Sequence, residues 1–493
     1  MRHAVDAEAH QHVGTSRGRT AVQGVFWSLF SSVTPGLVSA GVFLATSRTL
    51  RPDDFGVVAL ASTVVALLSA VAPAGFGQAI VQRAVLTRAH LDSVFWLCAG
   101  VGAVLYAAVF GLARPIAHAT GQPLLALLMP VLGIKIVLDL FAVVPNAILT
   151  RTMAFNKLAM RTVVASVAGA AACLLVLFAG YGLWALALSQ LVSSAAIFLG
   201  SLISAGWLPQ LSFERSAMRE LSRFGGFASG ANFINSINID QLMIGTLLGP
   251  FALGLFGFSR RIFQLMSDVM AGPLNAVSFS LLSSMQHEEE KRRRAFLLAT
   301  FISALVSFPV FVGFALIAKD AIPTLFGAHW LEAVPVVQAF CAIGVLASIG
   351  VLQSSLINSN GNAELWLLYI LAKQIGAAFY IWLFYRYGVA ELSASLAILT
   401  YLMWLPSVYI VARILRMRMR DYLASFAVPL TATLALIAAL SLLRLYWQPS
   451  GPLPRLAGAI ALGATVYCSV AWLLAHRQLQ AIWRIISNRR RAA

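Results

Sequence analysis

The chain has 493 residues, of which 60% are hydrophobic and only 11% are charged. A soluble protein carries about 25% charged residues, and the mean hydropathy of +0.83 excludes an ordinary soluble domain. The formal net charge of +17 is distributed over tails and short connections, so it does not indicate a nucleic-acid-binding protein.

Long apolar runs follow one another along the whole sequence. A bilayer-spanning helix needs about 20 mostly apolar residues, and the runs lack the alternating pattern of a transmembrane barrel. We therefore predict an all-α integral membrane protein with about 14 transmembrane helices. The predicted spans lie near residues 22–46, 55–73, 91–113, 124–148, 158–179, 183–204, 224–247, 251–273, 295–317, 332–356, 364–385, 388–412, 421–444 and 453–475.

Basic residues are unevenly distributed between successive connections. With the N-terminus placed in the cytoplasm, 24 of the 35 lysines and arginines fall on the cytoplasmic side and 7 on the opposite side. Positive charge collects on the cytoplasmic side of membrane proteins. The pattern predicts a multi-pass membrane protein with both termini in the cytoplasm and with basic residues that also meet anionic membrane lipids.

Two short segments far apart in the chain resemble each other. Residues 50–57 read LRPDDFGV and residues 248–255 read LGPFALGL, so leucine, proline and glycine match in register. This repeat predicts an N-terminal six-helix lobe over residues 1–211 and a second over residues 212–420. The second lobe would begin with an interfacial amphipathic helix, and residues 421–493 would form two extra spans and a basic tail.

Charged and polar side chains inside the predicted spans are the candidates for function, because a charge near the bilayer centre costs at least about 2.5–3.5 kcal/mol. Such residues are expected to face protein or a water-filled cavity. The candidate substrate-binding residues are Arg260, Arg261, Gln264 and Lys373. The candidate coupling or gating residues are Lys135, Asp139, Asp240 and Asp268. A cationic cavity suits a diphosphate, since arginine offers a forked donor to phosphate oxygens.

A purely structural interpretation of these charges is the alternative. Lys135 and Asp139 are four residues apart and can pair on one helical face. Arg260 and Arg261 can extend toward the membrane interface. They also point about 100° apart, so the sequence favours only one of them for the cavity.

No motif for catalysis, nucleotide binding or metal binding is present. Asp53 and Asp54 fall in the short turn of the repeat, no GxxxxGK[ST] loop occurs, and the histidines and the four cysteines are scattered. We therefore expect a protein that is not an enzyme and that holds no metal and no cofactor.

Several short segments together resemble a known family. Residues 50–60, 75–83, 145–151, 180–186 and 240–256 are similar to segments of the Wzx-type polysaccharide and lipopolysaccharide flippases, within the multidrug/oligosaccharidyl-lipid/polysaccharide exporter superfamily. The resemblance implies two six-helix lobes in a V plus two spans. It also implies transport of a polyprenyl-diphosphate-linked oligosaccharide from the cytoplasmic to the periplasmic leaflet by alternating access, with polysaccharide-assembly proteins as partners. Unlike related lipid flippases, the first two spans carry no charge here.

Two other functions remain open on the sequence. A multidrug or cation antiporter of the same superfamily would use acidic cavity residues, and the acids Asp139, Asp240 and Asp268 nearly match the cations in number. A membrane polymerase or ligase of the same glycans would need a large periplasmic loop, whereas the connections here are short.

Overall fold

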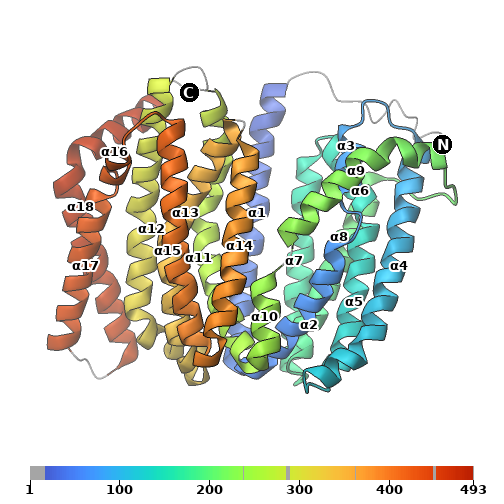
Figure 1. Cartoon of the computed structure of the whole chain (residues 1–493), viewed down its shortest axis with the longest axis horizontal. Coiled ribbons are helices and arrows are strands. Elements are labelled where there is room, and N and C mark those ends of the chain that lie inside the picture. The colour runs from blue at the N-terminus through green and yellow to red at the C-terminus, as the bar shows by residue number, and fades with distance from the viewer. Residues whose placement is uncertain (1–16, 237, 285–288, 361, 448–450, 492–493) are drawn as a thin grey trace. The chain divides into compact units, whose positions relative to one another are not determined.

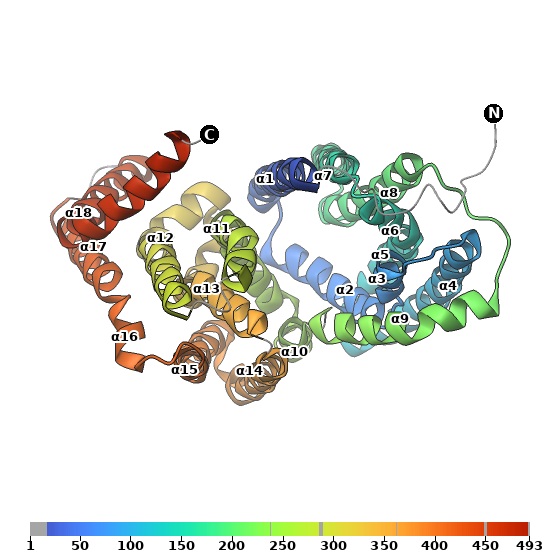
Figure 2. The same cartoon turned by 90° about the horizontal axis from the view of Figure 1, so that it is seen from above.

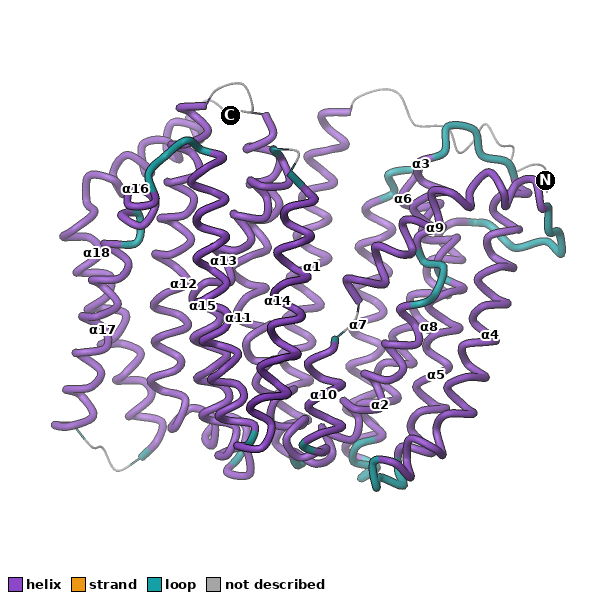
Figure 3. Tube along the Cα trace, in the orientation of Figure 1, coloured by secondary structure: helices purple, strands orange, loops and turns teal. Residues whose placement is uncertain are grey.

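The structure is a computed structural model that describes residues 17–236, 238–284, 289–360, 362–447 and 451–491. All regular secondary structure in these ranges is helical (Figure 3). The prediction of an all-α protein is therefore confirmed. The chain divides into two compact units, Met1–Gly254 and Leu255–Ala493.

The first unit is built from pairs of neighbouring helices. Its helices are α1 (Arg17–Thr49), α2 (Pro52–Ala70), α3 (Gly75–Gln82), α4 (Arg88–Ala119), α5 (Leu125–Phe141), α6 (Val143–Arg151), α7 (Phe155–Phe178), α8 (Trp184–Ala205), α9 (Arg215–Ser236), α10 (Ile239–Leu247) and the start of α11 (Gly249–Ser284). The closest pairs are α7 with α8 and α4 with α5, and α5 also packs on α8 and α2 (Figure 2).

The second unit contains the remainder of α11 and the helices that follow it. These are α12 (Glu289–Phe326), η2 (Ala328–Ala333), α13 (Val334–Ser359), α14 (Ala363–Phe384), η3 (Tyr385–Tyr387), α15 (Val389–Ile414), α16 (Met419–Ala424), α17 (Ala427–Tyr446) and α18 (Pro452–Arg491). Aromatic contacts fill its centre: Phe258 stacks on Trp330 with ring centroids 3.9 Å apart, and Phe256 lies 5.0 Å from Phe340.

Helices α17 and α18 pack against each other and against α12 (Figure 1). Ala432, Leu436 and Leu440 of α17 form an apolar cluster with Tyr467 and Ala471 of α18. The Tyr467 hydroxyl donates a hydrogen bond to the Leu305 carbonyl on α12 over 2.9 Å. The last two predicted spans are therefore an integral layer of the second unit.

Eleven helical segments of the described residues are long and apolar enough to cross a membrane, and each overlaps one predicted span. The other three predicted spans, residues 22–46, 224–247 and 251–273, correspond to α1, to α9 with α10, and to α11. The number fourteen stays a prediction. The predicted location of the termini cannot be followed to the ends of the chain, because residues 1–16 and 492–493 lie outside the described part.

The seventh predicted span differs from the expectation of one continuous helix. Helix α9 begins at Arg215 and ends at Ser236, and α10 begins at Ile239. The predicted interfacial helix and the first half of the predicted span thus form a single helix. The break falls in a stretch with three asparagines, which favour turns and helix starts over helix interiors, and Asn238 is the N-cap residue of α10.

Candidate functional site

The two repeat segments pack directly against each other at the start of α2 and α11. A Cβ atom added to Gly56 would lie 1.7 Å from the carbonyl oxygen of Pro250, and one added to Gly254 would lie 1.9 Å from that of Pro52. The contact is reciprocal, because the glycine of each segment meets the proline of the other. Glycine at both positions is what permits the two backbones to approach this closely.

Asp53 and Asp54 lie in the same turn, where the structure assigns Asp54 a local role. The Asp54 carboxylate accepts a hydrogen bond of 3.1 Å from the Arg51 backbone N–H at the start of α2. An acid in the first turn also complements the positive end of the helix dipole. This part of the repeat therefore serves helix initiation. The second segment starts its helix differently, through Gly249 at φ +85°.

Polar contacts between α2 and other helices continue beyond the repeat segment. The Thr63 hydroxyl donates to the side-chain oxygen of Gln241 on α10 over 3.2 Å. The Gln190 amide on α8 donates to the Ser62 hydroxyl over 3.4 Å. Two neighbouring residues of α2 thus hold two different helices through hydrogen bonds between polar side chains.

Three of the four predicted substrate-binding residues and one predicted coupling residue form a stripe on α11, which we call the α11 stripe: Arg260, Arg261, Gln264 and Asp268. Gln264 and Asp268 are exposed, and the two arginines are half-buried on either side of them. At 100° per residue all four lie within an arc of about 100°. Both arginines therefore border the same face of α11, and the expectation that only one of them serves a cavity stays a prediction.

One position beside the α11 stripe has free space around it. Gly257 lies on the same face one turn earlier, and a Cβ atom there would meet no heavy atom within 4 Å. Arg261 and Asp268 interact electrostatically along the helix. The stripe thus combines two guanidinium groups with an acid that partly offsets their charge.

Lys373 belongs to α14 of the same unit and lies half-buried one turn after Tyr369. Elsewhere in this unit, Ser407 on α15 donates to the side-chain oxygen of Gln353 on α13 over 3.0 Å, and the Gln353 amide donates to the Tyr422 hydroxyl on α16 over 3.1 Å. Sequence analysis missed this buried polar network, which links three helices of the unit that contains Lys373.

The predicted coupling residues are divided between helices. Lys135 and Asp139 form an ion pair on α5, as their spacing predicted, and their side chains remain 34% and 45% exposed. Asp240 lies half-buried in the first turn of α10, in the same unit. Asp268 belongs to the α11 stripe in the second unit. The structure therefore places the four residues at three separate positions.

A cluster that sequence analysis missed anchors the segment between α8 and α9 to the start of α4. The buried Asp92 carboxylate accepts hydrogen bonds from the Gln210 backbone N–H over 3.1 Å and from the Ser212 hydroxyl over 3.2 Å. The Ser93 hydroxyl accepts one of 2.9 Å from the Glu214 backbone N–H. The connection that enters the predicted second lobe is thus fixed to the first unit.

Glu220 on α9 completes this anchor. It lies 3.0 Å from the His90 ring and forms an ion pair with Arg83. The hydrogen bond from His90, together with the charge of Arg83, lowers the pKa of the Glu220 carboxyl. Helix α9 is therefore held to His90 of α4 by a hydrogen bond and to Arg83 at the end of α3 by an ion pair that exists when Glu220 is ionised.

Arg151 is a second residue whose role was missed. Its guanidinium is only 3% exposed and donates to four backbone carbonyls at the end of α3, those of Ile80, Val81, Arg83 and Ala84. These carbonyls are left without intrahelical partners by the end of the helix. The arginine counted in the sequence as a cytoplasmic charge is a buried cap for α3.

Comparisons with known proteins agree on the family. Residues 45–335 match the family described as polysaccharide biosynthesis protein. The succinoglycan biosynthesis transport protein ExoT of Rhizobium meliloti (strain 1021) is 30% identical over 65% of this chain and 66% of its own length. The lipopolysaccharide biosynthesis protein WzxC of Escherichia coli (strain K12) is 25% identical over 70% of this chain and 71% of its own. The teichuronic acid biosynthesis protein TuaB of Bacillus subtilis (strain 168) is 25% identical over 90% of this chain and 94% of its own.

Solved structures share the fold at low sequence identity. The lipid II flippase MurJ in an inward closed conformation superposes with a TM-score of 0.74 at 12% identity, covering 93% of this chain and 100% of that one. An inward-facing multidrug resistance transporter of the MATE family gives a TM-score of 0.61 at 16% identity, covering 78% and 98%. The chain is a multi-pass membrane protein that belongs to the polysaccharide biosynthesis protein family, as its resemblance to Wzx-type flippases predicted.

Proposed function

We propose that the protein is a flippase that moves a lipid-diphosphate-linked oligosaccharide from the cytoplasmic to the periplasmic leaflet of the bacterial inner membrane. The observation that carries this proposal is family membership over residues 45–335, joined by a relative named as a succinoglycan transport protein. The chemistry of the α11 stripe supports it, because two half-buried guanidinium groups within one arc of a helix suit the oxygens of a diphosphate.

The proposed binding residues are Arg260, Arg261, Gln264 and Lys373. Guanidinium groups bind phosphate through paired hydrogen bonds, and the low dielectric of a membrane protein strengthens that contact. The glutamine amide between the arginines can donate to a phosphate or a sugar oxygen. The lipid tail of the substrate would remain in the bilayer while the head group crosses.

The test is glycan export in cells that lack the endogenous transporter. Arg260→Ala is expected to reduce export strongly at normal abundance in the membrane, and Arg260→Lys to restore it only in part. The control is Arg294→Ala, because that side chain is 79% exposed and pairs only locally with Glu290. Export by Arg260→Ala at the wild-type level would remove the α11 stripe from the mechanism.

We also propose that Lys135, Asp139, Asp240 and Asp268 act in coupling or gating during alternating access. The pair on α5 allows a sharp experiment. Lys135→Gln with Asp139→Asn removes both charges and leaves no unpaired ion. Loss of transport in this double variant supports coupling, whereas normal transport would show that the pair is only structural.

The proposed topology has fourteen spans, two six-helix lobes over residues 1–211 and 212–420, and two extra spans with a basic tail over 421–493, with both termini in the cytoplasm. The distribution of lysine and arginine supports this orientation. Reporter fusions at the C-terminus and in the 387–389 connection test it, and a periplasmic C-terminus would contradict it. The expected protein partners are other polysaccharide-assembly proteins, and pull-down from a polysaccharide-producing strain tests that expectation.

A further inference from the structure

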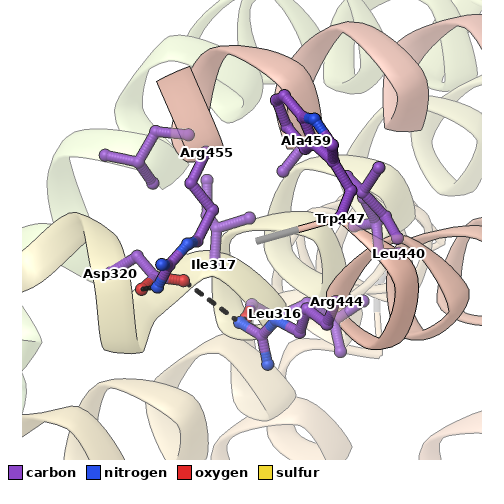
Figure 4. Close-up of a pocket in the computed structure, with 10 residues that line it drawn as sticks. Leu316, Ile317, Asp320, Leu440, Arg444, Trp447, Arg455 and Ala459 are labelled. Carbon is purple, nitrogen blue, oxygen red and sulfur yellow. Dashed lines mark hydrogen bonds and ion pairs between the residues drawn. The ribbon is translucent and has the colours of Figure 1, made fainter. Parts of the chain in front are cut away.

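A small cleft lies in the second unit where α12, α17 and α18 meet (Figure 4). Its enclosed part holds only about 20 Å³, and the remaining space between its walls opens to the outside. Its walls are mostly apolar and include Leu316, Leu440 and Leu443. It is separate from the α11 stripe, and no step of the proposed transport mechanism uses it.

Three charged side chains meet in the cleft. Asp320 of α12 accepts a hydrogen bond of 3.2 Å from Arg455 of α18, and a guanidinium nitrogen of Arg444 on α17 lies 3.8 Å from its other oxygen (Figure 4). Two guanidinium groups thus share one carboxylate, which leaves a formal charge of +1. The distance of 3.8 Å is too long for a hydrogen bond, so Arg444 is held mainly through its bond to the Leu316 carbonyl.

The exposure of the three side chains shows which of them a ligand can reach. Arg444 and Arg455 are 46% and 39% exposed, whereas Asp320 is 22% exposed. An incoming anion therefore meets the two cations before the acid. A simple ion pair that only fastens helices would not require a second arginine at a distance beyond hydrogen bonding.

The position along the helices places the cleft at the membrane boundary. Arg444 lies in the last turn of α17 and Arg455 in the first turn of α18, on either side of their connection. Trp447 lines the same cleft, and its ring lies over Gly458, where an added Cβ atom would be only 2.3 Å away. Tryptophan collects at the level of lipid head groups.

We propose that Arg444 and Arg455 at the mouth of this cleft bind the phosphate of a lipid head group, with the adjoining acyl or prenyl chain lying against Leu443 and Trp447. The arginines provide forked donors for phosphate oxygens, and the apolar wall suits the chain below the head group. The shared chemistry is an anionic phosphate on a hydrocarbon chain, which either a bilayer phospholipid or a polyprenyl phosphate supplies. The choice of leaflet depends on the orientation proposed above, but the site itself does not.

The test is lipid-dependent thermal unfolding of the purified full-length protein in an uncharged detergent. Phosphatidylglycerol and undecaprenyl phosphate are added separately, with zwitterionic phosphatidylcholine as the reference. At least one of the two anionic lipids is expected to raise the unfolding temperature more than phosphatidylcholine does. A response to phosphatidylglycerol alone identifies a bilayer phospholipid as the ligand, and a response to undecaprenyl phosphate alone identifies a polyprenyl carrier.

Three variants connect the lipid response to the cleft. Arg444→Gln is expected to weaken binding of the active lipid about tenfold, because a hydrogen bond to a charged group is lost. The matched control Lys319→Gln removes an exposed cation next to Asp320 in the chain that does not line the cleft, and it should bind as the wild type does.

Asp320→Asn distinguishes a lipid-binding site from an ion-pair cluster that only holds the helices together. It removes the acid that competes with the lipid phosphate, so binding should tighten even though the protein without lipid loses an ion pair. Equal shifts with all three lipids, unchanged binding by Arg444→Gln, or weaker binding by Asp320→Asn would each overturn the proposal.

Discussion

The reciprocal contact between the two repeat segments gives the sharpest prediction about stability. In Gly56→Ala the new methyl group would lie 1.7 Å from the Pro250 carbonyl oxygen, whereas real Cβ atoms essentially never come within 3.0 Å of another heavy atom. The helices α2 and α11 would have to separate locally by at least 1.3 Å. The neighbouring atom belongs to the backbone, so no side-chain rotation can relieve the clash.

The expected magnitude follows from two opposing effects. Inserting an extra methyl group into a filled space costs about 1–3 kcal/mol of stability. A clash with backbone atoms belongs at the upper end of this range, because the backbone yields less than a side chain. Replacing glycine by alanine inside a helix also adds about 1 kcal/mol of stability, because alanine has the higher helix propensity. We therefore expect Gly56→Ala to destabilise the protein by about 2 kcal/mol and Gly254→Ala to do the same, since its Cβ atom would lie 1.9 Å from the Pro52 carbonyl oxygen.

The assay is thermal unfolding of the purified variants in detergent, with glycan export in cells as the functional measure. Gly257→Ala is the matched control, because it lies three residues after Gly254 on the same helix and an added Cβ atom would meet nothing within 4 Å. The double variant Gly56→Ala/Gly254→Ala should lose less stability than the sum of the losses in the two single variants. The helix separation forced by one new methyl group also makes room for the other. Gly56→Ala and Gly257→Ala unfolding at the same temperature would refute this reasoning.

Three further predictions concern the first unit. Arg151→Lys should lower stability by about 2–3 kcal/mol in chemical unfolding, because a lysine cannot serve the carbonyls at the end of α3 with a forked donor. Asp92→Ala should cost about 1–3 kcal/mol and increase proteolysis of the 206–214 connection, since two donors lose their acceptor. The lowered pKa of Glu220 predicts that its contribution is complete above about pH 5 and is lost as the pH falls through the lowered value. The stability difference between wild type and Glu220→Gln, measured against pH, should shrink in that acidic window and stay constant above it.

Local spacing and hydropathy predicted a good part of the molecule. Apolar run length located the helices now seen in both units, because a membrane helix satisfies its own backbone and needs only local sequence. The Lys135–Asp139 ion pair was also predicted from local sequence, because residues four positions apart lie on the same face of a helix. The four polar residues of the α11 stripe were recognised from the sequence as candidates, and the structure places them within one arc of the helix.

Contacts between distant segments were beyond the reach of such patterns. Arg151 caps carbonyls that lie 67–71 residues earlier in the chain, and nothing local distinguishes it from the other basic residues of the loops. Asp92 accepts hydrogen bonds from residues 118 and 120 positions away. The break between α9 and α10 was missed because the hydropathy of residues 224–247 resembles one span, while the asparagines near its centre carried the opposing signal.

The reciprocal contact explains which positions of the repeat are similar and which are not. The glycine of each segment packs on the proline of the other, as in a two-fold symmetric interface where both partners present the same surface. Both residues are constrained together, because each glycine faces the other segment's proline backbone. Phe55 and Leu253 occupy matching positions but have different neighbours: Phe55 packs edge-on against Phe43, whereas Leu253 packs on Gly245. A glycine that packs on the proline of the other segment cannot change without a clash, while a residue such as Phe55 or Leu253 that meets unrelated neighbours can, so the similarity persists at the reciprocal contact.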